Sequence, residues 1–143
     1  MKIVLDTNVL VSGLLKRGGN PGEIVALVLG GAVQTCHDTR ILAEYAEVLS
    51  RPRFRFDPHH VRAVLSKIRA DGLSVRPRIF VRGLPDADDA PFLEVALSCG
   101  ADYLVTGNIA HFPPERHHGM AVVTPAQFIQ LWRQQHPAQP EQV

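Results

Sequence analysis

Short apolar runs alternate with helix-periodic stretches along the chain. The runs predict strands at residues 2–5, 32–36, 103–106 and 122–123. Because each run is almost continuously apolar, it suits a strand that is buried on both faces of a sheet. A further extended segment is expected at either residues 73–75 or residues 79–81.

Apolar residues at helical spacing predict helices between these strands. The expected helices cover residues 8–15, 22–29, 39–50, 59–70, 91–99 and 125–132, with a loop at 51–58. Asp38 or Thr39 is expected to cap the third helix, and Asp88 or Asp89 the fifth. Thr124-Pro125-Ala126-Gln127 is a capping-box pattern that opens the last one.

Strands that alternate with helices predict an α/β fold, in which a mainly parallel sheet carries helices on both faces. The 143 residues are a common size for one domain, and the sequence shows neither an internal repeat nor a linker. We expect the folded domain to cover residues 2–133. A flexible C-terminal tail is expected at residues 134–143.

The net charge of +1 hides an uneven distribution of charge. Residues 51–82 contain nine basic side chains and two acids, whereas the rest of the chain is acidic. This asymmetry fits a face that binds a polyanion, and it equally fits a solvated basic face.

The sequence also indicates a cellular compartment. Cys36 and Cys99 lack metal-ligand spacing and are expected to be small core residues of a protein in a reducing compartment. Asp6 interrupts the first apolar run too early for a signal peptide. The longest mostly apolar stretch, residues 24–33, is about half of the ~20 residues that a membrane span needs. We therefore expect a cytoplasmic protein without a membrane segment.

Acidic residues fall where a parallel sheet builds its sites, beyond the carboxyl ends of the strands. Asp6 directly follows the first strand, Asn108 follows the strand at 103–106, and residues 85–89 form an acidic loop before a helix. Glu44 borders the apolar stripe of the third helix. Carboxylates that converge at one edge repel one another, and oxygen ligands suit Mg²⁺ or Mn²⁺ rather than zinc.

Each of these acids also has a structural interpretation. Asp88 or Asp89 can serve only as a helix cap, Asp86 can stabilise a turn, and Glu44 can be a boundary residue. Asp6 is the hardest to explain in this way, because the end of a buried strand is a costly place for an unpaired charge.

Four sequence blocks resemble the PIN domain family of metal-dependent nucleases. The blocks are residues 5–10 (LDTNVL), 43–52 (AEYAEVLSRP), 86–93 (DADDAPFL) and 101–108 (ADYLVTGN), in that order. The His111-Phe112-Pro113 that follows resembles the VapC-like subgroup, the toxin components of toxin–antitoxin systems. The resemblance runs from about residue 2 to residue 132. It implies a three-layer fold with a central, mainly parallel sheet of four to five strands.

The resemblance also implies roles for individual residues. Asp6, Glu44 and Asp89 match the catalytic, metal-binding acids, and Asn108 stands as a metal ligand where many members have Asp. Asn8, Thr106 and Ser12 are expected to support and orient these ligands. Asp86 and Asp88 are adjacent alternatives to Asp89 that are expected to support the site or hold a second ion. Arg51, Arg53 and Arg55, close to the helix of Glu44, are expected to bind the RNA backbone.

The function implied is an Mg²⁺- or Mn²⁺-dependent endoribonuclease, the toxin of a type II toxin–antitoxin pair, in which metal-activated water hydrolyses a phosphodiester. The expected partners are RNA, a cognate antitoxin protein and a second copy in a homodimer or higher oligomer. Asn108 motivates an alternative, a catalytically weak PIN-like module that binds RNA or protein without cutting.

Two further alternatives follow from the residues themselves. A phosphatase with Asp6 as nucleophile usually has a second Asp two residues on, where this chain has Asn8. His111, His117 and His118 lack clean zinc-ligand spacing, which favours ordinary loop histidines over a zinc site.

Overall fold

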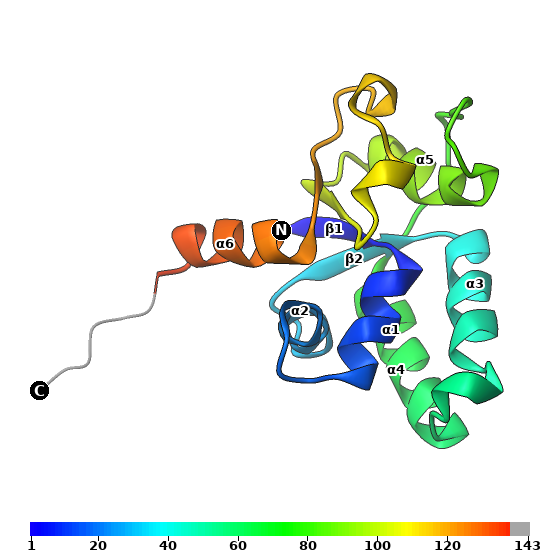
Figure 1. Ribbon diagram of the computed structural model, residues 1–143, viewed down its shortest axis with the longest axis vertical. Helices are drawn as coiled ribbons and strands as arrows, with labels where there is room; N and C mark the ends of the chain where they lie inside the picture. The colour runs from blue at the N-terminus through cyan, green and yellow to red at the C-terminus, as the bar shows by residue number, and fades with distance from the viewer. Residues whose placement is uncertain (138–143) are drawn as a thin grey trace, which may run out of the picture.

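The computed structural model describes residues 1–137 and confirms the α/β architecture (Figure 1). Five parallel strands form one sheet in the order β3-β2-β1-β4-β5. The strands are β1 (Lys2–Leu5), β2 (Gln34–His37), β3 (Leu73–Ser74), β4 (Tyr103–Val105) and β5 (Val122–Val123). The register pairs Ile3 with both Thr35 and Tyr103, which places β1 at the centre of the sheet.

Within residues 1–137, six α-helices connect or follow these strands. They are α1 (Thr7–Leu15), α2 (Asn20–Leu29), α3 (Thr39–Leu49), α4 (Pro58–Asp71), α5 (Ala90–Cys99) and α6 (Pro125–Gln135). Short 3₁₀ turns lie at Pro52–Phe54, Ala87–Asp89, Ile109–His111 and Pro114–Arg116. α5 packs on β1, β2 and β4, while α1, α2 and α4 lie on the opposite side of the sheet (Figure 1).

Burial on both faces explains the apolar strand sequences. Ile3, Val4 and Leu5 are at most 1% exposed. Phe92 and Leu93 of α5 are buried with them in a single hydrophobic core. Because β1 is held in this core, the position of Asp6, which directly follows Leu5, is fixed as well.

Several boundaries differ from the sequence-based expectation. The predicted strand 32–36 begins later, because Gly31 takes a left-handed conformation (φ 82°) and the chain is still turning at residues 32 and 33. Of the two extended segments considered, 73–75 supplies strand β3, whereas 79–81 is not a strand. The capping box of Thr124 and Gln127 is present at the start of α6.

The predicted domain end at residue 133 stays a prediction. α6 continues to Gln135, beyond the expected residue 132. Of the expected tail, residues 138–143 lie outside the described part of the chain. No helix within residues 1–137 is long and apolar enough to cross a membrane.

Candidate metal centre

Asp6 lies at the carboxyl edge of the sheet, where β1 ends and α1 begins. Its N–H donates to the carbonyl of Val105 (2.9 Å), which holds the ends of β1 and β4 together. It occupies the N-cap position of α1 without using its side chain as a cap. The carboxylate, in a residue only 5% exposed, is therefore available for other partners.

Two polar side chains orient the Asp6 carboxylate. The buried Thr106 hydroxyl donates to Asp6 Oδ2 (2.8 Å) and accepts from the Asn108 N–H (3.0 Å). The Asn8 amide donates to the same oxygen at 3.4 Å, while its carbonyl accepts from the Gly107 N–H (3.0 Å). The supporting positions predicted for Asn8 and Thr106 thus have contacts suited to that role.

Glu44 approaches Asp6 from α3. Its carboxylate accepts a hydrogen bond from the Thr7 hydroxyl, directly after Asp6. The neighbouring Tyr45 is buried, and its hydroxyl donates to the carbonyl of Leu5. Consecutive residues of α3 are therefore both tied to the end of β1, which fixes the helix register that brings Glu44 to the site.

The acidic loop has a different capping pattern from the expected one. Asp86, not Asp88 or Asp89, uses its carboxylate as a cap, accepting from the Asp88 N–H (2.9 Å) at the start of a 3₁₀ turn. Asp89 stands at the N-cap position of α5 in a helical conformation, which does not direct its side chain to the helix N–H groups. Its carboxylate is consequently free to face the acidic site.

His111 joins this cluster from the 3₁₀ turn after β4. Its Nδ1 lies 2.8 Å from Asp89 Oδ2, and potential ligand atoms of Asp86, Asp89 and His111 all lie within 4.8 Å of one another. His111, expected to be an ordinary loop histidine, thus lies beside an acid of the cavity, and a ligand role for it stays a prediction. His117 is accounted for otherwise, since its Nε2 lies 2.6 Å from the carbonyl oxygen of Phe112.

One cavity of about 510 Å³ connects these residues. Asp6, Glu44, Asp86, Asp88 and Asp89 all line it, together with Asn8, Ser12 and His111. Arg51 and Arg53 form part of its wall, whereas Arg55 is not among the lining residues. Asn108 is not among the lining residues either, although its backbone N–H donates to the Thr106 hydroxyl.

The pKa values of three cavity carboxylates, Asp6, Glu44 and Asp89, are raised above their ordinary values. Burial is the main cause of the raised pKa of Asp6, and hydrogen bonding from Thr106 opposes it. Burial and then the charges of Asp6 and Asp88 raise the pKa of Glu44. The pKa of Asp89 rises to about 6 through burial and the Asp6 charge. Burial is the largest cause of each shift, and neighbouring carboxylates add to it for Glu44 and Asp89. A cation bound in the cavity would favour the charged form of all three groups.

The donor set fits a divalent cation. Asp89 Oδ2 is buried and, among residues 1–137, has no partner in hydrogen-bonding geometry, although the His111 nitrogen is close to it. Asp89 Oδ2 and His111 Nδ1 are 2.8 Å apart, and both belong to the group of potential ligand atoms formed by Asp86, Asp89 and His111. Carboxylates with one imidazole suit Mn²⁺ better than Mg²⁺, which prefers oxygen alone.

Comparisons with known proteins agree with this geometry. A family model described as PIN domain matches residues 2–110. An uncharacterized protein of Methanocaldococcus jannaschii is 26% identical over 111 residues, which cover 76% of this chain and 71% of the relative.

Proposed function

Because the chain belongs to the PIN domain family, a nuclease-type fold, we propose that it is a metal-dependent endoribonuclease. One observation carries the proposal. Carboxylates from three separate segments, at the end of β1, in α3 and at the start of α5, line one cavity, and arginines lie on its wall. Acids that only capped helices or stabilised turns would not need to converge.

Asp6, Glu44 and Asp89 are proposed to hold the cation, and His111 takes the place expected for Asn108. A divalent cation bound there supplies a Lewis acid that offsets phosphate charge and activates water for attack on phosphorus. Thr106 and Asn8 keep the Asp6 carboxylate in one orientation, and Thr7 does the same for Glu44. Asp86 and Asp88 add negative charge at the exposed side of the cavity.

Arg51 and Arg53 are proposed to bind the RNA backbone. Arg51 pairs with Glu47 one helical turn earlier (2.8 Å), and both side chains are exposed, so the pair is easily exchanged for a phosphate. The guanidinium of Arg53 lies 4.7 Å from the centre of the Phe54 ring, which limits the positions of this cation beside the cavity.

A cleavage assay tests the proposal. We expect single-stranded RNA to be cut in the presence of Mn²⁺, and the Asp6→Asn variant to lose at least about 10³-fold in rate, because it removes charge at the centre of the site. Asp57→Asn is the matched control, since Asp57 is exposed and Asn retains its capping of α4. Equal rates for Asp6→Asn and the wild type would refute the assignment.

Calorimetric titration with Mn²⁺ separates the enzyme from a module that binds without cutting. The enzyme requires binding at submillimolar metal, with loss of binding in Asp89→Asn. RNA binding without any metal binding would favour the alternative function instead.

The biological role proposed is that of a toxin in a type II toxin–antitoxin pair, acting in the cytoplasm as a homodimer or higher oligomer. The blocks at residues 5–10 and 86–93, with His111-Phe112-Pro113, support it through the resemblance described above. Induction of the chain should arrest growth, and co-expression of a protein from an adjacent small reading frame should relieve the arrest. Unchanged growth on induction of soluble, active protein would argue against the toxin role.

A further inference from the structure

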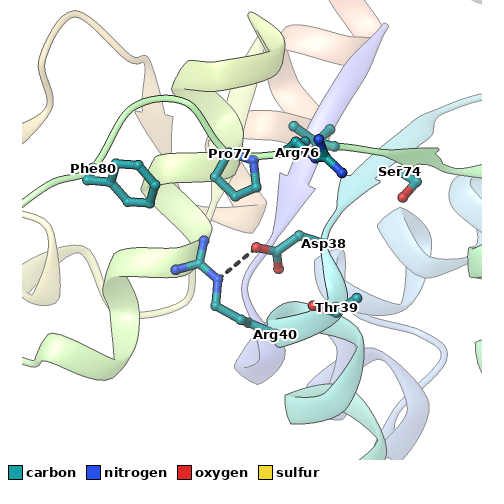
Figure 2. Close-up of a pocket in the computed structure, with 8 residues that line it drawn as sticks. Asp38, Thr39, Arg40, Ser74, Arg76, Pro77 and Phe80 are labelled. Atoms are coloured by element: carbon teal, nitrogen blue, oxygen red, sulfur yellow. Dashed lines mark hydrogen bonds and ion pairs between the residues drawn. The ribbon is translucent and has the colours of Figure 1, made fainter.

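A second cavity, of about 610 Å³, lies at the same edge of the sheet, beyond β2 and β3 (Figure 2). The start of α3 and the segment that follows β3 enclose it. Arg40, Arg76, Pro77 and Phe80 line it, and Figure 2 shows the guanidinium of Arg40 directed toward the side where Pro77 and Phe80 lie. The size is within the range of about 300–1,000 Å³ typical of ligand sites.

Residues 75–84, which we call the arginine loop, form its outer wall. The loop contains Arg76, Arg78 and Arg82 and no acidic residue. Arg116 adds a further cation, because its guanidinium lies against Gly83. In the described part of the chain none of these four arginines forms an ion pair within 4 Å, so their charges are uncompensated.

Phe80 is exposed because the backbone of the arginine loop is anchored on both sides of it. Ser98 Oγ accepts from the N–H groups of Arg78 (3.0 Å) and Ile79 (3.2 Å), and Glu94 Oε2 accepts from the Val81 N–H (2.9 Å). The side chain of Val81 is buried. These contacts hold the backbone on both sides of Phe80, whose side chain is 72% exposed.

The anchor itself is buried and paired. Glu94 is only 4% exposed, and its other oxygen lies 2.7 Å from Arg40 Nη1. Arg40 Nε in turn donates to Asp38 Oδ2 (2.7 Å), the contact drawn in Figure 2. A network of charged side chains, Asp38, Arg40 and Glu94, therefore holds the backbone of the arginine loop in one conformation.

We propose that Phe80 and the arginine loop bind single-stranded RNA on one side of the metal centre, with a base stacked on the Phe80 ring. The inference rests on the proposed function and names a second substrate contact for it. A fixed, exposed aromatic ring among unpaired cations is the combination that single-stranded nucleic acids require. The loop also leads directly into Asp86, so RNA held on it would pass toward the acidic cavity.

Charge complementarity favours RNA over an apolar protein partner for this surface. Within the arginine loop the large exposed apolar side chains are Ile79 and Phe80, and three arginines belong to the same ten-residue segment. A protein partner would need to bury or neutralise these arginines, whereas an RNA backbone supplies phosphates for them.

Binding is best measured in the Asp6→Asn background with EDTA, so that cleavage does not interfere. The probe is a fluorescein-labelled oligouridylate of roughly ten nucleotides, a length in the range of single-strand binding sites. Phe80→Ala should weaken binding about tenfold, as expected for loss of one stacked base. Phe80→Trp should retain affinity, and Phe80→Leu should lose as much as Phe80→Ala, because leucine is apolar but has no π-face.

The arginines are tested by their salt dependence. Arg78→Glu should weaken binding and reduce the slope of log affinity against log salt by about 0.7 or more. Arg133→Glu is the matched control, because Arg133 lies on α6 and pairs with Glu23, far from the arginine loop in Figure 1. Circular dichroism checks that each variant is folded.

Three outcomes would overturn the proposal: unchanged affinity in Phe80→Ala, full affinity in Phe80→Leu, or a Phe80→Ala variant that alters only the oligomeric state. The experiments distinguish failure of the proposed RNA-binding surface, formed by Phe80 and the arginine loop, from failure of the proposed nuclease activity. If the wild type cuts RNA with Mn²⁺ but substitution of Phe80 leaves RNA affinity unchanged, only the proposed RNA-binding surface is refuted. Phe80-dependent binding with no cleavage by the wild type refutes the nuclease alone.

Discussion

The buried hydroxyl of Thr106 donates a 2.8 Å hydrogen bond to the Asp6 carboxylate, across the ends of the neighbouring strands β4 and β1. This bond lowers the pKa of Asp6 against the opposing effect of burial. Thr106 therefore has two effects on Asp6, which are to fix its orientation and to favour its charged form.

Replacement of Thr106 by valine tests both effects, because valine has nearly the same shape without the hydroxyl. We expect Thr106→Val to weaken Mn²⁺ binding about 10- to 100-fold, as for other partners that orient a metal ligand. Thr35→Val is the control, since Thr35 is buried on β2 and its hydroxyl has no partner among residues 1–137. Equal Mn²⁺ affinity in Thr106→Val and the wild type would contradict the role given to Thr106.

The pKa of Asp89, raised to about 6 from its ordinary 3.8, makes metal binding and stability depend on pH. The folded metal-free protein binds this proton more tightly than the unfolded chain does, so its stability falls as pH rises from about 4 to about 6. Because the cation must displace the proton, we expect Mn²⁺ to raise the melting temperature more at about pH 8 than at about pH 5. Thermal unfolding with and without Mn²⁺ measures this difference.

Asp89→Asn provides the comparison for that experiment. The variant removes the titrating group, so its metal-free stability should change less between about pH 4 and pH 6. Its Mn²⁺-induced shift should also be small at both pH values. A pH profile identical to that of the wild type would assign the dependence to another group.

His111 is expected to determine which metal the site prefers. An imidazole nitrogen favours Mn²⁺ over Mg²⁺, so His111→Ala should lose more Mn²⁺-dependent than Mg²⁺-dependent activity. His118→Ala is the control, because His118 is an exposed loop histidine outside the candidate metal group. The ratio of the two activities is the measurement, and a proportional loss with both metals would exclude a ligand role.

Glu94 is expected to be the most sensitive position of the arginine loop network. Glu94→Ala leaves Arg40 and the Val81 N–H without their partner, which should lower the free energy of unfolding by about 2–3 kcal/mol. Ser98→Ala, which loses only the neutral acceptor for Arg78 and Ile79, should cost about 1 kcal/mol. Urea titrations compare the two, and a larger loss in Ser98→Ala would contradict the network.

The sequence was sufficient to predict a mainly parallel sheet and to place Asp6 and Thr106 at the carboxyl ends of two of its strands. Their contact depends on the pairing of β1 with β4, a strand order that the sequence pattern did not predict. Helical periodicity identified Glu44 as a candidate site residue, because it borders the buried stripe of α3. Which ligands a bound ion would use stays a prediction.

His111 could not be placed in the same way. Its position depends on the path of the chain through the 3₁₀ turn Ile109–His111, and such turns leave no periodic signal. The arginine loop is similar. Residues 79–81 resemble a strand in composition, yet their N–H groups bond to side chains of α5 instead of a neighbouring strand.

The attachment of the arginine loop to α5 has a consequence for how such a protein can diversify. Helix α5 begins at the acidic loop, and its side chains Glu94 and Ser98 accept hydrogen bonds from the backbone of the arginine loop. Because residues 76–84 belong to none of the five strands, their sequence can change while the two anchoring side chains stay. If the loop binds RNA as proposed, substrate preference can change through this segment while the proposed metal ligands stay the same.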